Sequence, residues 1–320
     1  MSRRIINILR AQDVALSRTL EQKIADAGPY DQRIDPHILT PVRNHLVKTG
    51  RITRLKRDGV PWFYLSETLK GKVTERINDL EPIHNAIRQQ DILMRIGQAL
   101  EIAVYRALLA QNKLEYLGGF LDLNDHDDGD LYKKEEPPSL LAGRAIPNQR
   151  RLDFLIHHPS AGWAGIEIKN IREWLYPDRT EIKDLLGKCV HLNAVPVLIA
   201  RRAPYVSRRL FEPCGMVIWE TFGQRYPASE HELAAKAKHK KLLGFHDIKL
   251  GNEPGPHLTQ FLTQFLPDAL PAARERFDEH TDLLEAFAIG EMDYAEFAAR
   301  VRRREDGTTE DHDWYDEPSY

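Results

Sequence analysis

A chain of 320 residues, 42% hydrophobic and 29% charged, has the balance of a globular protein with about two domains, and no apolar run in it is long enough to span a membrane. Its two cysteines, Cys189 and Cys214, lack metal-ligand spacing, and no secretion signal is present, so we expect a cytoplasmic protein without a zinc site or disulfides. The net charge of −3 hides a segregation, because residues 1–80 hold 15 Lys and Arg against 9 Asp and Glu, whereas residues 305–320 hold seven acids and no Lys or Arg.

Helical periodicity dominates the N-terminal region. Apolar residues recur at helical spacing over residues 5–27, which predicts one helix there. A further helix is predicted over about 36–48, with Asp35 as N-cap, Pro36 in the first turn and Gly50 just beyond the end. These two segments predict a small helical module at the start of the chain.

A basic hairpin is predicted to follow these helices. Apolar and basic residues alternate after Gly50, and Asp58-Gly59 is typical of a two-residue hairpin turn, so residues 51–65 are expected to form two strands. Helices followed by such a hairpin resemble a winged helix-turn-helix over about residues 1–66, with 36–49 as the recognition helix. The resemblance implies contact with DNA, since a helix fits the major groove and basic side chains neutralise phosphates. The expected DNA-binding residues are Arg43, Asn44, Lys48, Arg51, Arg54, Lys56 and Arg57. Winged helices also serve as protein-docking modules, and that alternative stays open.

The middle of the chain is predicted to be helical and then irregular. Residues 68–90 are expected to form a helical connector, and apolar spacing predicts a long helix over about 91–111. Leu114–Leu121 is a weak candidate strand. The acidic, proline-containing segment 122–149 is expected to be a loop.

Two strand-like segments carry the chemistry. Residues 151–158 and 163–170 fold as an antiparallel hairpin if the turn is centred near Ser160, which places 153 opposite 167 and 151 opposite 169. Alternation then puts Asp153, Glu167 and Lys169 on one open face. The other face carries apolar residues, expected to be Leu152, Phe154, Ile156, Ile166 and Ile168.

Two carboxylates and a lysine on one face predict a metal-dependent hydrolase. Asp153 and Glu167 offer hard oxygen ligands of the kind that Mg²⁺ or Mn²⁺ prefers. Such an ion acidifies a bound water and neutralises charge on a phosphodiester. Lys169 is placed to orient the attacking water and to stabilise negative charge in the transition state. The alternative is an ordinary amphipathic hairpin with a surface ion pair.

The residues Asp153 and Glu167-Ile168-Lys169 resemble the motif of the PD-(D/E)xK nuclease superfamily, although Leu152 replaces the proline. The resemblance covers about residues 91–202, where the expected order of helix, three strands, helix and strand also fits. It implies a metal-dependent DNA endonuclease. Glu101 would be the extra acid that some members carry on the first helix, unless it is simply a solvated helix residue. Action on two DNA strands implies a homodimer.

Several neighbours of the motif have open interpretations. Asn170 and Arg172 could contact phosphates or cap the next element. His157 and His158 are expected at the surface near the turn. Lys188 and His191 are expected to be solvated residues of a helix over 179–192.

We therefore predict an α/β protein with a winged helix domain (1–80), a nuclease core with a mixed sheet flanked by helices (81–225), a helical extension (226–304) and an acidic disordered tail (305–320). The expected function is metal-dependent hydrolysis of DNA, in restriction or phage defence by analogy of architecture. Two alternatives remain: a DNA-binding regulator with an inert nuclease fold, and the same chemistry on RNA or branched DNA.

Overall fold

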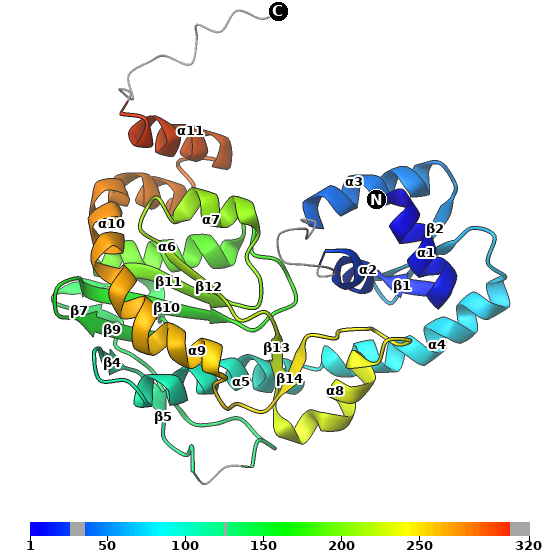
Figure 1. Ribbon diagram of the computed structural model, residues 1–320, viewed down its shortest axis with the longest axis horizontal. Coiled ribbons are helices and arrows are strands. Elements are labelled where there is room, and N and C mark those ends of the chain that lie inside the picture. The colour runs from blue at the N-terminus through cyan, green and yellow to red at the C-terminus, as the bar shows by residue number, and fades with distance from the viewer. Residues whose placement is uncertain (26–35, 125–126, 308–320) are drawn as a thin grey trace, which may run out of the picture.

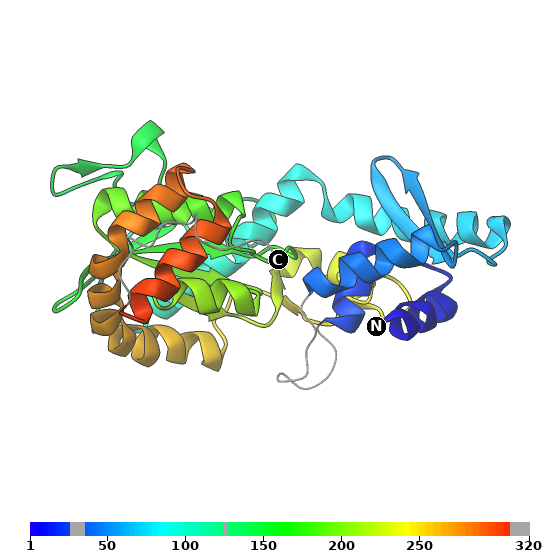
Figure 2. The same cartoon turned by 90° about the horizontal axis from the view of Figure 1, so that it is seen from above.

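The structure, a computed structural model, describes residues 1–25, 36–124 and 127–307. The predicted N-cap Asp35 and most of the predicted acidic tail lie outside these residues. The described chain is a mixed α/β protein, with an N-terminal module at one end and a five-stranded sheet at the other (Figures 1 and 2). None of the helices within these ranges combines the length and the apolar character that crossing a bilayer requires.

The N-terminal module is a helical bundle with a three-stranded sheet. In chain order it comprises α1 (Ser2–Gln12), β1 (Val14–Leu16), α2 (Ser17–Ile24), α3 (Pro36–Lys48), β2 (Ile52–Arg57) and β3 (Val60–Leu65). The strands pair in the order β1-β3-β2. The predicted helix 36–48 and the predicted hairpin are confirmed. The two turn residues Asp58 and Gly59 both have positive φ, 49° and 80°, as a two-residue hairpin turn requires.

The prediction of one helix over residues 5–27 is wrong. Helix α1 ends at Gln12, Asp13 adopts a positive φ of 64°, and Val14–Leu16 forms a strand before α2 begins. These three apolar residues pair with Trp62, Phe63 and Tyr64 of β3, and all three are buried. Burial against a distant strand therefore overrides the local helical periodicity.

The larger sheet lies between two layers of helices. Its strands are β4 (Glu115–Leu117), β9 (Phe154–His158), β10 (Gly162–Lys169), β11 (Val195–Ala200) and β12 (Val217–Glu220). They pair in the order β12-β11-β10-β9-β4, with β10, β11 and β12 parallel and the other neighbours antiparallel. Helix α5 (Gln90–Leu109) covers one face, where Tyr105 stacks on Phe154. Helix α6 (Thr180–Leu192) covers the other face (Figure 1).

Short elements lie between β4 and β9. The first of them falls in the candidate strand 114–121, and the others fall in the segment 122–149, which was predicted to be a loop. They are β5 (Gly119–Phe120), β6 (Lys134–Glu135), β7 (Leu140–Leu141), β8 (Arg144–Ala145) and a 3-10 turn over Pro147–Gln149. Strands β5 and β6 pair with each other, so this segment is better ordered than its composition indicates.

The remaining elements connect and complete the two ends. They are α4 (Lys70–Ile87), α7 (Tyr205–Phe211), β13 (Gln224–Tyr226), α8 (His231–Lys238), β14 (Ile248–Leu250), α9 (Pro256–Gln260), a π-helical turn (Phe261–Phe265), α10 (Leu266–Ile289) and α11 (Tyr294–Glu305). Helices α4 and α5 run in succession from the N-terminal module to the large sheet (Figure 1). An apolar cluster that includes Val14, Trp62, Leu80 and Tyr226 packs the module against α4 and α8.

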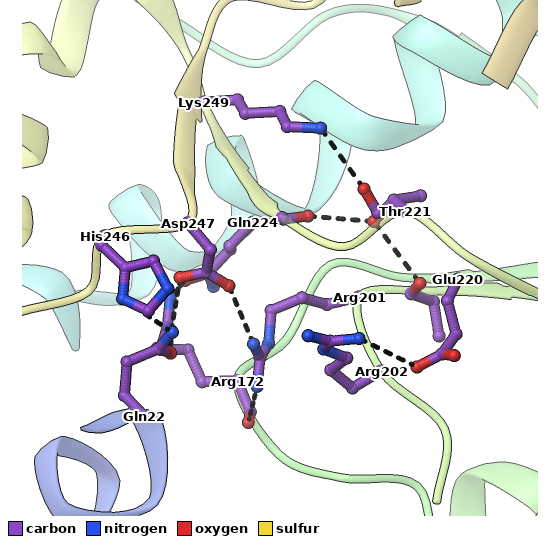
Figure 3. A network of polar contacts seen from close by, with 12 residues as sticks. Gln22, Arg172, Arg201, Arg202, Glu220, Thr221, Gln224, His246, Asp247 and Lys249 are labelled. Carbon is purple, nitrogen blue, oxygen red and sulfur yellow. Dashed lines mark hydrogen bonds and ion pairs between the residues drawn. The ribbon is translucent and has the colours of Figure 1, made fainter. Parts of the chain in front are cut away.

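A buried ionic group holds the N-terminal module to the end of the large sheet (Figure 3). Asp247, before β14, pairs with Arg172 at 2.7 Å and with Arg201 at 2.8 Å. Arg172 also donates a hydrogen bond to Gln22 of α2, and its guanidinium lies 4.0 Å from the ring centre of Phe245. We call Arg172, Arg201 and Asp247 the arginine clamp.

Candidate active site

The hairpin of β9 and β10 has the predicted register. Phe154 pairs with Ile166 and His158 with Gly162, so the turn is centred on Ser160 as expected. Regular pairing stops at Phe154, however, because the chain bends at Asp153. Arg151 therefore has no partner strand residue in β10, and its guanidinium donates instead to the carbonyl oxygen of Pro137 at 3.0 Å.

The bend also changes which face Leu152 occupies. Gly165 has no side chain, and a Cβ there would lie 2.5 Å from Leu152 Cδ1 and 2.8 Å from Cys189 Sγ of α6. Leu152 thus packs under α6 rather than beside Phe154, which stacks on Tyr105 of α5. The prediction that Leu152 and Phe154 share one face is wrong. The face of Glu167 is not open either, since α6 covers it and Glu167 is only 6% exposed.

Asp153 uses both carboxylate oxygens at the bend. Oδ2 accepts a hydrogen bond from the backbone N–H of Ile168 at 2.7 Å, which replaces the ladder bond that the bend interrupts. Oδ1 lies 2.8 Å from Nζ of Lys134. The same ammonium lies 2.8 Å from Oε2 of Glu101 in α5. Glu101 is therefore part of the site and not a solvated helix residue.

Lys134 reaches this position because β6 pairs with β5, which packs against α5. A Cβ at Gly119 of β5 would lie 2.9 Å from the Tyr105 ring, so glycine permits the close approach of the β5–β6 pair to the helix. Gln98, one turn before Glu101, binds the backbone of Tyr132 twice, at 2.9 and 3.0 Å. Sequence analysis did not identify Lys134, although a Lys-Lys pair beside five aspartates was a visible signal.

Glu167 is enclosed by two lysines. Its Oε1 lies 2.6 Å from Lys169 Nζ, and its Oε2 lies 3.1 Å from Lys188 Nζ. Lys188 also pairs with Asp184 at 2.9 Å and is 7% exposed, so the prediction that it is merely solvated is wrong. We call Glu101, Asp153 and Glu167, with Lys134, Lys169 and Lys188, the carboxylate cluster.

Burial and mutual repulsion disturb the carboxylates of this cluster. Burial, followed by the charge of Asp153, raises the pKa of Glu101 to about 7. The same two causes raise the pKa of Glu167. Burial acts to lower the pKa of Lys169, but Glu167 and Asp153 outweigh it, so the pKa of that lysine is raised. The lysines are therefore charged, and the acids are crowded enough to favour binding of cations.

Two acids of the cluster meet at a single position, which the ammonium of Lys134 occupies. Glu101 Oε2 is buried and, among the described residues, no donor makes a hydrogen bond of suitable geometry to it; its ionic partner is Lys134. Two hard carboxylate oxygens, from Glu101 and Asp153, thus converge on one cation position. Within the same ranges, no three His, Cys, Asp or Glu side chains form a ready ligand set. Each acid pairs with a lysine instead.

The other predicted neighbours have structural contacts. Asn170 is buried, and its side-chain amide donates to the carbonyl oxygens of Ile96 and Arg225. Arg172 belongs to the buried arginine clamp, so neither residue is free to contact a phosphate as the open interpretation allowed. His157 and His158 lie half-buried at the turn end of the hairpin. His191 Nδ1 lies 2.7 Å from the carbonyl oxygen of Gly187 in its own helix.

The seven predicted DNA-binding residues divide into two groups. The exposed ones are Asn44, Lys48, Arg51, Arg54 and Lys56. Arg43 is half-buried, with its guanidinium 4.9 Å from the ring centre of Phe63, and burial lowers its pKa. Arg57 donates to Asn78 and pairs with Glu81 of α4 at 2.9 Å. The exposed charges therefore lie at the end of α3 and on β2.

Comparison of the chain with known protein families, with characterised proteins and with solved structures found no significant match. The carboxylate cluster must therefore be interpreted from its own geometry and chemistry.

Proposed function

We propose that this protein is a metal-dependent DNA endonuclease whose active site is the carboxylate cluster. The observation that carries the proposal is that Glu101 of α5 and Asp153, at the bend before β9, meet at one ammonium, while Glu167 of β10 lies near Asp153 and pairs with Lys169. Buried acids with raised pKa values are unfavourable for folding, and such groups concentrate at functional sites.

The order of elements supports a nuclease core of the PD-(D/E)xK type. That resemblance implies helix, three strands, helix and strand, and the chain provides α5, β4, β9, β10, α6 and β11 in this order. Glu101 lies on the first of these helices, and Glu167 and Lys169 lie on the third of these strands. Asp153 lies at the bend just before β9. The order of these residues along the chain is compatible with the resemblance.

The N-terminal module supports binding to double-stranded DNA. Its order of helices and strands, with a hairpin after the third helix, resembles that of a winged helix and supports this assignment. Arg51, Arg54 and Lys56 are exposed on or next to β2, where they could neutralise phosphates. An exposed basic hairpin joined to an acidic site favours a reader of DNA combined with a hydrolase.

The chain's own residues would share the work of hydrolysis. Asp153, with Glu101 or Glu167, would hold Mg²⁺ or Mn²⁺, which supplies an acidified water and neutralises phosphate charge when bound. Lys169, the most exposed lysine of the cluster at 24%, would orient the attacking water and stabilise negative charge on the phosphoryl oxygens. Lys188 would keep the buried Glu167 ionised from the opposite side.

The decisive experiment is a cleavage assay on plasmid DNA with Mg²⁺ or Mn²⁺. Lys169→Ala is expected to lower the cleavage rate at least about 100-fold, as the loss of a transition-state charge contact does. It should still fold, because Lys188 remains to pair with Glu167. Asp153→Asn is expected to lower the cleavage rate by a similar factor, because it removes a carboxylate that would hold the metal. This variant should also fold, since the amide oxygen can still accept the hydrogen bond from the Ile168 N–H.

Lys133→Ala provides the matched control, because Lys133 is exposed next to the site and makes no side-chain contact with the cluster's acids that the structure records. Wild-type cleavage that persists with excess chelator, or a Lys169→Ala rate equal to that of the control, would overturn the proposal. DNA binding without cleavage would favour a regulator with an inert fold. Cleavage of RNA or branched DNA alone would change the substrate. Sedimentation of the DNA complex tests the proposed homodimer.

A further inference from the structure

The ammonium of Lys134 occupies the point at which two carboxylates of the cluster meet. Its Nζ lies 2.8 Å from Glu101 Oε2 and 2.8 Å from Asp153 Oδ1. The side chain is 16% exposed, as is that of Glu101, and that of Asp153 is 15% exposed. A single cation thus pairs with two acids whose charged forms burial and mutual repulsion would otherwise destabilise.

We propose that Lys134 is an internal counterion that holds the cation position of the site, and that a divalent metal ion binds there only by displacing it. The inference rests on the proposed function, because it takes Glu101 and Asp153 as ligands of the metal. Lys134 and the ion use the same two oxygens, so their binding is competitive. The protein without metal is then folded and inactive.

The surrounding contacts fix the backbone of β6 and leave the side chain of Lys134 able to change its conformation. The backbone before Lys134 is held by the two hydrogen bonds between Gln98 and Tyr132 and by the bond from the Lys133 N–H to Asp122. Phe120, paired with Lys134 across β5 and β6, is buried. A lysine side chain has four rotatable bonds, so its ammonium can leave the acids without disturbing these contacts.

Competition with an internal lysine makes the affinity for metal lower than two such acids would otherwise have. Part of the free energy of Mn²⁺ binding is used to break the two ion pairs of Lys134, and only the remainder contributes to the measured affinity. The residue at position 134 therefore sets the concentration of metal ion at which the proposed nuclease becomes active. A neutral residue at 134 should make the site bind metal more tightly.

Mn²⁺ binding measured by calorimetry, without DNA, tests the proposal. Lys134→Met is expected to bind Mn²⁺ at least about tenfold more tightly than wild type, since hydrogen bonds to charged groups are worth more than that factor. Lys133→Met, the same substitution at the exposed neighbour, is expected to match wild type. Asp153→Asn is expected to lose binding.

Thermal unfolding provides a second readout. Lys134→Met leaves two buried acids without their counterion, so its melting temperature without metal should fall, and Mn²⁺ should raise it more than in wild type. Lys134→Gln keeps a group that can donate to the acids and serves if the methionine variant does not fold.

The outcomes separate this inference from the proposed function. If wild type and the Lys134 variants bind Mn²⁺ equally, or the variants bind it more weakly than Lys133→Met, Lys134 does not compete and the inference fails while the metal site stands. If no variant binds Mn²⁺, the metal site and the inference fail together.

Discussion

The molecule contains two groups of buried charges whose electrostatics are opposite. In the arginine clamp one acid faces two guanidiniums, and although burial acts to raise the pKa of Asp247, Arg172 and Arg201 lower it to about 2. In the carboxylate cluster, burial and the neighbouring Asp153 raise the pKa of Glu101 to about 7 despite Lys134. Asp247 and Glu101 are both largely buried, but Asp247 has two cations beside it, whereas Glu101 has a second acid beside it.

The difference shows which buried charges serve structure and which are available for chemistry. The clamp satisfies its carboxylate from both sides and joins elements far apart in the chain. The cluster places Asp153 close enough to Glu101 and to Glu167 to repel both, which is unfavourable for the fold and favourable for binding a cation. A raised pKa of the acids, rather than burial itself, therefore distinguishes the candidate site.

The largest expected effect comes from removing the acid of the clamp. Asp247→Ala takes away the counterion that Arg172 and Arg201 share, and is expected to lower the free energy of unfolding by about 3–5 kcal/mol. Chemical denaturation measures this change. Asp278→Ala breaks an exposed pair with Arg274 and should cost less than about 1 kcal/mol. Equal effects of the two substitutions would mean that the clamp is not a structural ion pair.

An intermediate effect is expected in the dependence of stability on pH. Glu101 has a pKa of about 7 in the folded protein against an ordinary value of 4.5, so the folded state keeps its proton to a higher pH than the unfolded state does. Between about pH 4.5 and 7, unfolding therefore becomes easier as the pH rises, by on the order of 3 kcal/mol. Glu101→Gln should flatten this part of the curve, measured with a chelator present.

The clamp gives the opposite trend at lower pH. Asp247 has a lowered pKa, so its contribution is complete above its unfolded value near 3.8 and is lost as the pH falls through about 2. Asp247→Ala should remove only this acidic limb. If Glu101→Gln left the pH dependence of stability between pH 4.5 and 7 unchanged, Glu101 would not be the source of that dependence, and the contrast between the cluster and the clamp would fail.

The smallest effect on stability is expected for charges that are not buried. Arg54 and Lys56 are exposed on β2, so the double substitution to Ala should change the free energy of unfolding by less than about 0.5 kcal/mol. The salt dependence of DNA binding should nevertheless weaken by about one unit of log–log slope per lost phosphate contact. Unchanged affinity and slope would show that this hairpin contacts something other than DNA. Arg57→Ala, which breaks the pair with Glu81, is the comparison.

Features with local causes could be predicted from the sequence. The Asp58-Gly59 turn, the helix over 36–48 and the register of β9 with β10 depend on turn chemistry and on alternation within a few residues. The closeness of Glu167 and Lys169 follows from the two-residue period of a strand. Each of these predictions needed only neighbouring residues.

Features that depend on distant contacts could not be predicted. Lys134 reaches Asp153 from a segment that was predicted to be a loop. It can do so because Gln98 of α5 binds the backbone of Tyr132, two residues earlier. The bend that moves Leu152 under α6 depends on the space above Gly165. Strand β1 forms only because β3 is there to pair with it. In each case the partner lies far away in the sequence.

The arginine clamp has a consequence for where DNA would be cut. Gln22 of α2 bonds to Arg172, which follows β10, so the module that would hold the duplex is attached directly behind the strand that carries Glu167 and Lys169. A rigid attachment keeps constant the distance between the part of the duplex that the module binds and the phosphate that is cleaved. Because a duplex advances about 3.4 Å per base pair, a constant distance selects a constant number of base pairs. We therefore expect cleavage at a defined offset from the bound sequence, rather than scattered cuts around it.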